Sequence, residues 1–337
     1  MIGILEQVLG RIEPADQEAS TAAARALDAK TKPRGSLGRL EEVARRVAGI
    51  RHDPAPGRLQ AAVVVAAADH GVASEGVSAY PQAVTRQMLA NFNDGGAAVC
   101  VLARIAGASL LVIDTGVGAP TGNIADGPAM SRADALRWVE KGMGVADDLA
   151  RDGVGVVAIG EMGIGHTTAA AALCAALLDV EPAATCGRGT GVDDAGLARK
   201  VEVVSRALSA NDRSDDPLAV LAALGGFEVA FMCGLALGAA ANRQVVLLDG
   251  FIATVAALVA MRLAPDAADS MIAAHLSPEP GHRLALDALG LEPLLDFDLR
   301  LGEGSGAALA LPLLDASLAI LAEMATFESA GVTDAGR

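Results

Sequence analysis

The sequence predicts an α/β protein with a doubly wound parallel sheet and a small helical domain built from both ends of the chain. Two observations favour the sheet: short apolar, β-branched runs recur along the chain, and segments with helical periodicity lie between them. Continuous apolar runs of four to eight residues are typical of strands buried on both faces. Strands that alternate with helices indicate parallel pairing.

The predicted strands are the apolar runs at 61–68, 110–113, 154–159 and 245–248. Each run is followed by an acidic residue close to a glycine, and these acids are Asp69, Asp114, Glu161 and Asp249. The carboxyl ends of parallel strands meet at one edge of the sheet, where ligands bind. The four acids together therefore favour a polar site at that edge, although any one of them would suit an ordinary turn between strand and helix.

Helices are predicted between these strands, at 81–91, 96–105, 133–151 and 165–178. With the strands they make up the predicted catalytic domain, residues 61–300. Before it, helices are expected at 16–30 and 37–50, with Ser36 as the N-cap of the second.

The chain closes with a predicted amphipathic helix. Its apolar stripe consists of Leu311, Leu314, Leu318 and Leu321. Pro312 requires this helix to begin near it or to kink there. We expect the helix to pack with the N-terminal ones, so that residues 1–60 and 301–337 form the small helical domain.

Composition disfavours several classes of partner. The net charge is 26 − 41 = −15, which argues against binding to nucleic acid or to an anionic membrane, although a local loop can still bind phosphate. The apolar stretch 217–261 is interrupted by polar residues, so its pieces are shorter than the ~18 residues of a membrane span. The first ten residues contain Glu6 and no basic start, so no signal peptide is expected.

The cysteines point to a reducing compartment. The chain has four, Cys100, Cys174, Cys186 and Cys233, and none belongs to a CxxC pair. Each lies in an apolar or glycine-rich stretch, which predicts buried thiols in the cytoplasm.

A glycine-rich turn, GEMGIGHTT at 160–168, lies between a predicted strand and a predicted helix. It resembles the phosphate loop of nucleoside triphosphatases, but His166 occupies the position of the lysine in that loop. The spacing of Gly163 and Gly165 does not fit a dinucleotide-binding turn either. What remains is a helix N-terminus that can bind a monophosphate through backbone N–H groups, although glycine-rich turns also occur without a ligand.

A second glycine-rich segment, GRGTGVD at 187–193, allows close approach of its backbone to a ligand. Arg188 and Lys200 are candidate cations for a phosphate or a carboxylate. On these residues alone, Lys200 is better interpreted as a solvated lysine on a helix.

The segment AHLSPEPGH at 274–282 contains His275, Glu279 and His282, which are possible metal ligands. The spacing of the histidines crosses two prolines and matches no standard zinc signature. We therefore expect a structured loop and no metal.

Glu303 lies between Gly302 and Gly304 at the start of the last helix. One interpretation is a carboxylate stabilised by the helix dipole. The functional interpretation is a general base in an exposed, uncrowded turn, which the same dipole keeps ionised.

Taken in order, these segments resemble one family, the nicotinate-nucleotide–dimethylbenzimidazole phosphoribosyltransferases of cobalamin lower-ligand synthesis. The resemblance covers residues 32 to about 310. It is carried by KPRGSLGRLE (32–41), ADHGV (68–72), GEMGIGHTT (160–168), GRGTGVD (187–193), GGFEVA (225–230), LLDGF (247–251), SPEPGH (277–282) and LGEGSGAALA (301–310).

The resemblance implies a Rossmann-like sheet with a small helical domain, in a homodimer. We expect no cofactor and no metal. The resemblance also implies transfer of the 5-phosphoribosyl group from nicotinate mononucleotide to 5,6-dimethylbenzimidazole, giving α-ribazole 5′-phosphate and nicotinate, with inversion at C1′. Glu303 matches the general base, and Glu161 and Lys200 match the other charged catalytic positions.

The same resemblance implies two binding sites. The nucleotide site would use Gly163, Gly165, His166, Thr167, Gly187, Arg188 and Gly189. The benzimidazole pocket would use Tyr80, Met88 and Met162. One departure is that His166 stands where the resemblance leads us to expect asparagine.

Two other functions remain open on the residues. A phosphoribosyltransferase that uses phosphoribosyl pyrophosphate and magnesium should show paired acids after a strand, whereas Asp114 and Asp249 are each single. A non-catalytic nucleotide-binding protein could share the fold, but Glu303, Glu161 and Lys200 argue against it.

Overall fold

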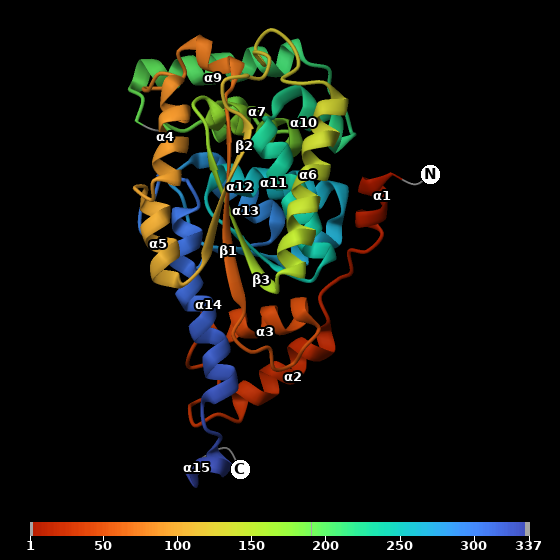
Figure 1. The fold of residues 1–337 in the computed structure, drawn as a ribbon, viewed down its shortest axis with the longest axis vertical. Helices are drawn as coiled ribbons and strands as arrows, with labels where there is room; N and C mark the ends of the chain where they lie inside the picture. The colour runs from red at the N-terminus through yellow and green to blue at the C-terminus, as the bar shows by residue number, and fades with distance from the viewer. Residues whose placement is uncertain (1–2, 190, 334–337) are drawn as a thin grey trace.

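Five parallel strands form one sheet in the order β2-β1-β3-β4-β5, of which Figure 1 labels β1, β2 and β3. The structure is a computed structural model and describes residues 3–189 and 191–333. The strands are β1 (Gln60–Ala68), β2 (Ser109–Gly116), β3 (Val154–Met162), β4 (Val245–Leu248) and β5 (Met271–Ala273). The four predicted strands are confirmed, and the short β5 adds an unpredicted edge.

Helices connect the strands and extend the chain at both ends. The α-helices are α1 (Ile4–Leu9), α2 (Gln17–Asp28), α3 (Arg39–Arg51), α4 (Ala83–Asn93), α5 (Ala98–Ala106), α6 (Arg132–Arg151), α7 (His166–Leu178), α8 (Pro182–Thr185), α9 (Asp194–Ala210), α10 (Pro217–Leu224), α11 (Phe227–Ala241), α12 (Phe251–Leu263), α13 (Pro280–Leu289), α14 (Ser305–Glu323) and α15 (Phe327–Ala330). Two 3-10 helices, Gly71–Glu75 and Pro265–Ser270, complete the set in the described residues.

The sheet is covered on both faces, which confirms the doubly wound prediction. Successive side chains of a strand point to opposite faces. In β1, Val63 and Val65 pack into a cluster with residues of α3, α5 and α14. Ala62 and Val64 pack into a larger cluster with α6, α7, α11 and α12. Because strands buried on both faces need apolar residues throughout, the continuous runs in the sequence are explained.

Close helix packing compensates for the scarcity of aromatic side chains, which make up 2% of the chain. Helices α6 and α11 cross with their backbones nearly in contact. A Cβ atom on Gly142 would lie 2.0 Å from the Phe231 carbonyl oxygen, and one on Gly234 would lie 1.9 Å from that of Val139. Small residues at a crossing let two helices approach closely enough to fill the core with backbone.

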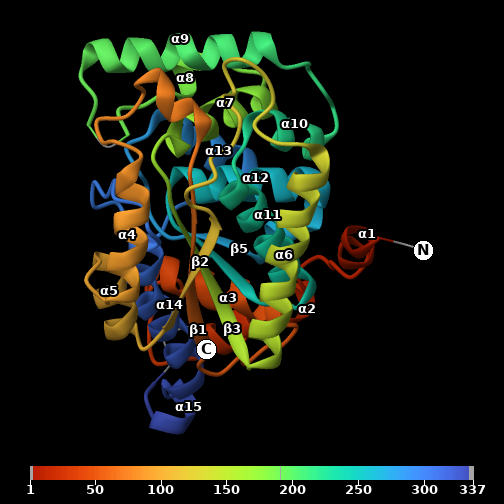
Figure 2. The same cartoon turned by 45° about the horizontal axis from the view of Figure 1, so that its top comes forward.

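The helix α14 links the sheet to the N-terminal helices, as Figures 1 and 2 show along its length. Its predicted leucine stripe, Leu311, Leu314, Leu318 and Leu321, is buried. Leu321 joins a small cluster with Ala23 and Leu27 of α2 and with Ala44 and Ala48 of α3. The helix is long and apolar enough to cross a membrane by composition, but more than half of that stretch is buried here, as in a core helix.

Two local expectations need correction. Pro312 lies inside α14, which begins at Ser305, so the alternative that the helix begins near Pro312 is wrong. Ser36 is not the N-cap of α3, because the helix begins at Arg39 after Gly38, whose φ is +54°. The turn is held instead by Glu41, whose carboxylate accepts from the Leu37 amide (3.0 Å) and pairs with Lys32 (2.8 Å).

All four cysteines are buried and free, as the sequence predicts. Burial raises the pKa of Cys174 to about 12 and, with smaller opposing effects, that of Cys186 to about 11. The pKa of Cys233 is also raised by burial.

Candidate active site

The candidate site lies at the carboxyl ends of the parallel strands. The strand order places β1 and β3 side by side while β2 lies on the other side of β1. This is the point where the chain winding changes direction, and ligands of doubly wound sheets bind in the crevice there. His70 follows β1, Glu161 is in the last two residues of β3, and Asp249 follows β4.

A left-handed turn carries Glu303 to this edge. The φ angles of Gly302, Glu303 and Gly304 are +76°, +64° and +80°. Glycine adopts such angles freely, but for glutamate they are uncommon and mark a position that the surrounding structure enforces. The turn lies directly on β3, because a Cβ atom on Gly160 would be 2.3 Å from the Gly304 nitrogen.

Asp249 anchors the same turn from β4. Its Oδ2 accepts a hydrogen bond from the Gly304 amide (3.1 Å), and its Oδ1 accepts one from the Ala307 amide (3.0 Å). These are N–H groups at the start of α14, which lack partners within the helix. His275 Nε2 lies 3.5 Å from Asp249 Oδ1. Asp249 therefore fixes the position of Glu303.

Glu303 is 6% exposed, so the expectation of an exposed, uncrowded turn is wrong. Burial and the nearby charges of Glu161 and Asp249 raise the pKa of Glu303 to about 7. The expectation that the helix dipole keeps this carboxylate ionised is therefore wrong as well. Glu303 exchanges a proton near neutral pH, which suits a general acid or base.

Glu161 forms an ion pair with His166 across the start of the glycine-rich loop. His166 Nδ1 lies 2.6 Å from Glu161 Oε2, with the two side chains 13% and 5% exposed. The other carboxylate oxygen reaches the Glu303 turn, because a Cβ atom on Gly302 would be 2.5 Å from Glu161 Oε1. Burial is the largest single effect on His166 and lowers its pKa, but the charge and hydrogen bond of Glu161 and the charge of Glu228 together outweigh it, so the net shift in the pKa is upward.

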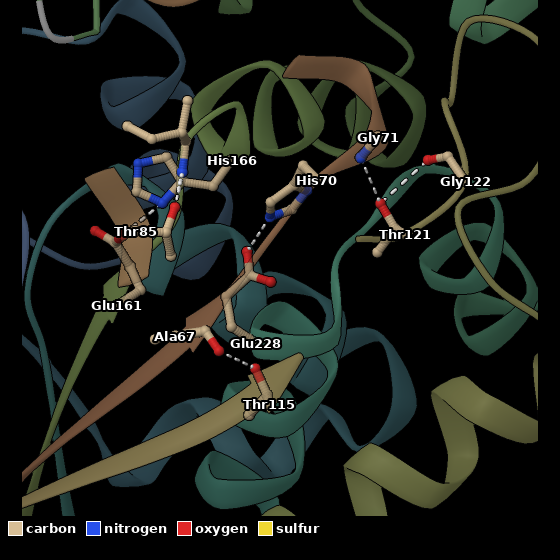
Figure 3. A network of polar contacts seen from close by, with 11 residues as sticks. Ala67, His70, Gly71, Thr85, Thr115, Thr121, Gly122, Glu161, His166 and Glu228 are labelled. Atoms are coloured by element: carbon tan, nitrogen blue, oxygen red, sulfur yellow. Dashed lines mark hydrogen bonds and ion pairs between the residues drawn. The ribbon is translucent and has the colours of Figure 1, made fainter. Parts of the chain in front are cut away.

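A second carboxylate–imidazole pair lies next to the first, and it was not predicted from the sequence. His70 Nε2 lies 2.8 Å from Glu228 Oε1, and both side chains are fully buried. Figure 3 shows His70 reaching Glu228 and His166 reaching Glu161 from neighbouring positions. The only signal in the sequence was that each residue belongs to a segment carrying the family resemblance, ADHGV and GGFEVA.

The loop 163–165 is held tightly and leads into α7. Gly165 is the N-cap of α7 with φ +97°, and the Ile164 amide donates to Thr85 Oγ1 (3.2 Å). A Cβ atom on Gly165 would meet His70 Cβ and the Ala73 nitrogen at 3.3 Å. The amides of His166 and Thr167 thus open a helix, where N–H groups favour an anion.

Lys200 joins the two glycine-rich segments. Its Nζ donates to the Gly187 carbonyl (2.8 Å) and to Thr167 Oγ1 (3.2 Å), and the residue is 1% exposed. The interpretation of Lys200 as a solvated lysine is therefore wrong. Burial lowers the pKa of Lys200, against the opposing charge of Glu279.

Glu279 and His282 support the same region. Glu279 Oε1 accepts from the Gly189 amide (2.8 Å). His282 Nδ1 accepts from the Ser277 amide (2.9 Å), and its Nε2 lies 3.0 Å from Thr254 Oγ1. Burial, with the charge of His275, lowers the pKa of His282 to about 3. These contacts agree with the prediction of a structured loop.

The remaining predicted binding residues have different surroundings in the structure. Arg188 donates to the Val192 carbonyl (3.1 Å) and pairs with Asp194 (2.5 Å), so in this structure it closes its own loop. Met88 and Met162 pack against the same hydrophobic cluster. The side chain of Tyr80 is 53% exposed. Their binding roles remain predictions.

The other acids at strand ends cap backbone groups. Asp69 Oδ2 accepts from the Gly118 amide (2.7 Å), and Asp114 Oδ1 accepts from the amides of Gly116 (3.0 Å) and Val117 (2.8 Å). For Asp114 and for Oδ2 of Asp69, these hydrogen bonds fit the interpretation as ordinary turn residues.

Comparison with known proteins gives one consistent result. A family model described as "Phosphoribosyltransferase" matches residues 12–332. The chain is 48% identical to the nicotinate-nucleotide–dimethylbenzimidazole phosphoribosyltransferase of Geotalea uraniireducens over 99% of both chains. It is 49% identical to the protein of that name from Desulforudis audaxviator, over 98% of this chain and 99% of the relative.

Solved structures agree. The crystal structure of CobT from Thermus thermophilus matches with a TM-score of 0.91 and 48% identity, over 94% of this chain and 99% of that one. A second crystal structure, of the nicotinate-nucleotide–dimethylbenzimidazole phosphoribosyltransferase from the same organism, matches with a TM-score of 0.90 and 46% identity, over 95% and 99% of the two chains.

Proposed function

Because this chain belongs to the nicotinate-nucleotide–dimethylbenzimidazole phosphoribosyltransferase family, we propose that it transfers the 5-phosphoribosyl group of nicotinate mononucleotide to 5,6-dimethylbenzimidazole. The products are α-ribazole 5′-phosphate and nicotinate. The observation that carries the chemistry is Glu303, a buried carboxylate with a pKa raised by burial and by its acidic neighbours to about 7.

The reaction needs one proton acceptor. The donor carries its ribose on a cationic pyridinium nitrogen, which leaves C1′ with the bonding electrons as a neutral ring. The acceptor nitrogen becomes cationic as it bonds to C1′, unless its second nitrogen releases a proton. Glu303 takes that proton, and a group with a pKa near the working pH does so most effectively.

The turn around Glu303 keeps this base in place. Asp249 holds the amides of Gly304 and Ala307, and Gly160 lies beneath Gly304. A base fixed by its neighbours needs little rearrangement when the acceptor binds. Attack on the face opposite the leaving group would invert C1′ from β to α.

The phosphate of the donor is proposed to bind between the two glycine-rich segments. Gly163, Gly165, His166 and Thr167 provide the start of α7, and Gly187, Arg188 and Gly189 lie across from it. Lys200 contacts both segments through Thr167 and Gly187. Backbone amides at a helix start, with a buried ammonium beside them, favour a phosphate dianion.

The benzimidazole is proposed to bind near Met88 and Met162, with Tyr80 closing over it. Both methionines border the hydrophobic cluster beneath the Glu303 turn. Methionine side chains adapt to different shapes, so we expect related benzimidazoles to be accepted. We also propose that the protein is a homodimer. A cytoplasmic location is in keeping with its four buried free thiols.

The role of Glu303 is tested by Glu303→Gln, which keeps the size of the side chain but cannot accept the proton. Single-turnover release of nicotinate should fall by about 10²–10⁴ with the fold intact. The matched control is Glu323→Gln, the same change at an exposed position of α14. Wild-type release by Glu303→Gln would refute the role of Glu303.

The same assay separates the alternative functions. A pyrophosphate-dependent transferase would require phosphoribosyl pyrophosphate and magnesium and would leave nicotinate mononucleotide intact. A non-catalytic binding protein would release no nicotinate with either donor. We expect release from nicotinate mononucleotide when dimethylbenzimidazole is present.

A further inference from the structure

Two carboxylate–imidazole pairs lie next to each other beside the turn that carries Glu303. Glu228 pairs with His70 at 2.8 Å, and His166 pairs with Glu161 at 2.6 Å. The rings of His70 and His166 meet edge to face, with centroids 6.5 Å apart. The arrangement comes from separate parts of the fold, since Glu228 is the second residue of α11, Glu161 is the last but one of β3 and His166 is the first of α7.

One of these pairs reaches the turn of Glu303. Glu161 Oε1 lies so close to Gly302 that a Cβ atom there would be 2.5 Å away, and Gly302 directly precedes Glu303. The negative charge of Glu161 is one of the causes that raise the pKa of Glu303. Whatever fixes the charge of Glu161 therefore acts on the base.

We propose that His166 is a positioning residue for the transfer reaction: as an imidazolium it holds Glu161 ionised and oriented under Gly302, and so governs the protonation of Glu303. This inference rests on the proposed role of Glu303 as the base. It gives His166 a different task from phosphate binding, because its Nδ1 faces the carboxylate of Glu161 (Figure 3).

The charges around His166 favour its cationic form. Glu161 from β3 and Glu228 from α11 both stabilise the imidazolium, whereas Lys200 from α9 and burial oppose it, with a net upward shift in its pKa. His70 lies between His166 and Glu228. Glu228 stays ionised despite complete burial, because His70 and His166 lower its pKa.

Around Glu303, the facing charges are Glu161 and Asp249, both negative. Asp249 is already bonded to the amides of Gly304 and Ala307. Asp249 also faces a histidine, His275, but at 3.5 Å, whereas His166 lies 2.6 Å from Glu161. Glu161 is thus the carboxylate with the closer titratable partner.

The test is His166→Asn. The amide nitrogen of asparagine takes the place of Nδ1 and can still donate to Glu161, but it carries no charge. Asparagine is also the residue that the family resemblance leads us to expect, so the variant should fold. Without the imidazolium, Glu161 and Glu303 share a proton up to a higher pH, as coupled acids do.

We expect the acid limb of the pH profile of kcat/KM to move to higher pH by about one unit, the low end of the effect of an opposite charge within ~4–6 Å. The rate below the limb should fall about tenfold, and the rate well above it should return toward that of the wild type. The matched control is His52→Asn, because His52 lies outside the site in the left-handed region, which asparagine tolerates.

A loss of rate that is the same at every pH would overturn the inference, since it would mean only structural damage. An unchanged profile would overturn it too. If His166→Asn is slow at low pH only because it binds the donor poorly, the KM for nicotinate mononucleotide will carry the whole effect, and His166 is then a phosphate ligand instead.

If the asparagine variant does not fold, ring NMR of the five histidines provides a second test. The pKa values of His166 and His275 are both raised, each by a neighbouring carboxylate against burial. In Glu161→Gln, the titration of one of these two histidines should move to lower pH, and the titration of the other should not change. If neither moves, His166 is not coupled to Glu161.

Failure of this inference differs from failure of the proposed base. If Glu303→Gln keeps wild-type turnover, Glu303 is not the base, whatever His166→Asn does. If Glu303→Gln loses turnover while His166→Asn keeps the wild-type acid limb, Glu303 is the base and only the role of His166 is refuted.

Discussion

Gly160 and Gly304 touch through bare backbone: a Cβ atom on Gly160 would lie 2.3 Å from the Gly304 nitrogen and 2.5 Å from its Cα. Strand β3 therefore supports the turn that carries Glu303 without any side chain between them. The position of the base depends on the absence of a methyl group on a strand far from it in the sequence.

Gly160→Ala should displace the Glu303 turn. The added methyl meets backbone that cannot move without breaking the bonds to Asp249, so we expect lower kcat and a loss of about 1–3 kcal/mol in the free energy of unfolding. The control is Gly144→Ala on α6, where nothing lies within 4 Å of the added Cβ, and which should stabilise by about 0.5–1 kcal/mol. Urea unfolding and steady-state turnover measure both, and an unperturbed Gly160→Ala would contradict the contact.

Glu303→Gln should change how stability depends on pH. Folding raises the pKa of Glu303 from an ordinary 4.5 to about 7, so the native state keeps a proton that the unfolded chain has released. Wild-type stability therefore falls as the pH rises from about 4.5 to 7, and the glutamine variant escapes this loss. The difference in unfolding free energy should grow in favour of the variant by up to ~3 kcal/mol across that window and then level off.

The control for this experiment is Glu323→Gln, at an exposed position of the same helix. Its stability relative to the wild type should stay nearly constant over the same pH range. A constant difference for Glu303→Gln as well would mean that Glu303 titrates as an ordinary carboxylate.

Gly165→Ala should weaken binding of the donor. Gly165 has a φ of +97°, and the new Cβ would press on His70 and Ala73 at 3.3 Å, so the amides at the start of α7 would shift. We expect a higher KM for nicotinate mononucleotide together with some loss of stability. Gly290→Ala separates the two effects, because Gly290 has a φ of +65° with nothing within 4 Å and should lose stability without any change in KM.

Lys200→Met should affect the donor and spare the acceptor. The variant keeps much of the buried aliphatic length but loses the bonds to the Gly187 carbonyl and Thr167 Oγ1. We expect calorimetry to show weaker binding of nicotinate mononucleotide and unchanged binding of dimethylbenzimidazole. Lys141→Met, at an exposed lysine of α6, should change neither. Lost affinity for the base with normal affinity for the nucleotide would reverse the assignment.

The fold was largely predictable because its signals are local. Four strands are visible in the sequence as apolar runs, and the leucines of α14 mark its buried stripe. Strand β5 (Met271–Ala273) is too short to give such a signal. The start of α3 was misplaced because Ser36 has the chemistry of an N-cap, whereas Gly38 and the Lys32–Glu41 ion pair set the turn.

The site was less predictable because its properties depend on contacts between distant segments. Glycines on both sides of Glu303 suggest an open turn, yet Gly160 and Asp249 bury it and raise its pKa. From the sequence alone, Lys200 was interpreted as a surface lysine, whereas in the structure α9 places it against Gly187. The pairing of His70 with Glu228 joins residues 158 positions apart, and no spacing rule predicts it.

The four buried thiols give the protein an internal reporter of unfolding. A thiol reagent attacks only the thiolate, and burial both shields these sulfurs and raises the pKa of Cys174 to about 12. Modification must then wait for the chain to open, so its rate reports the opening of the core rather than surface chemistry. For the same reason, a single cysteine introduced on the exterior could be labelled selectively with the native cysteines left in place.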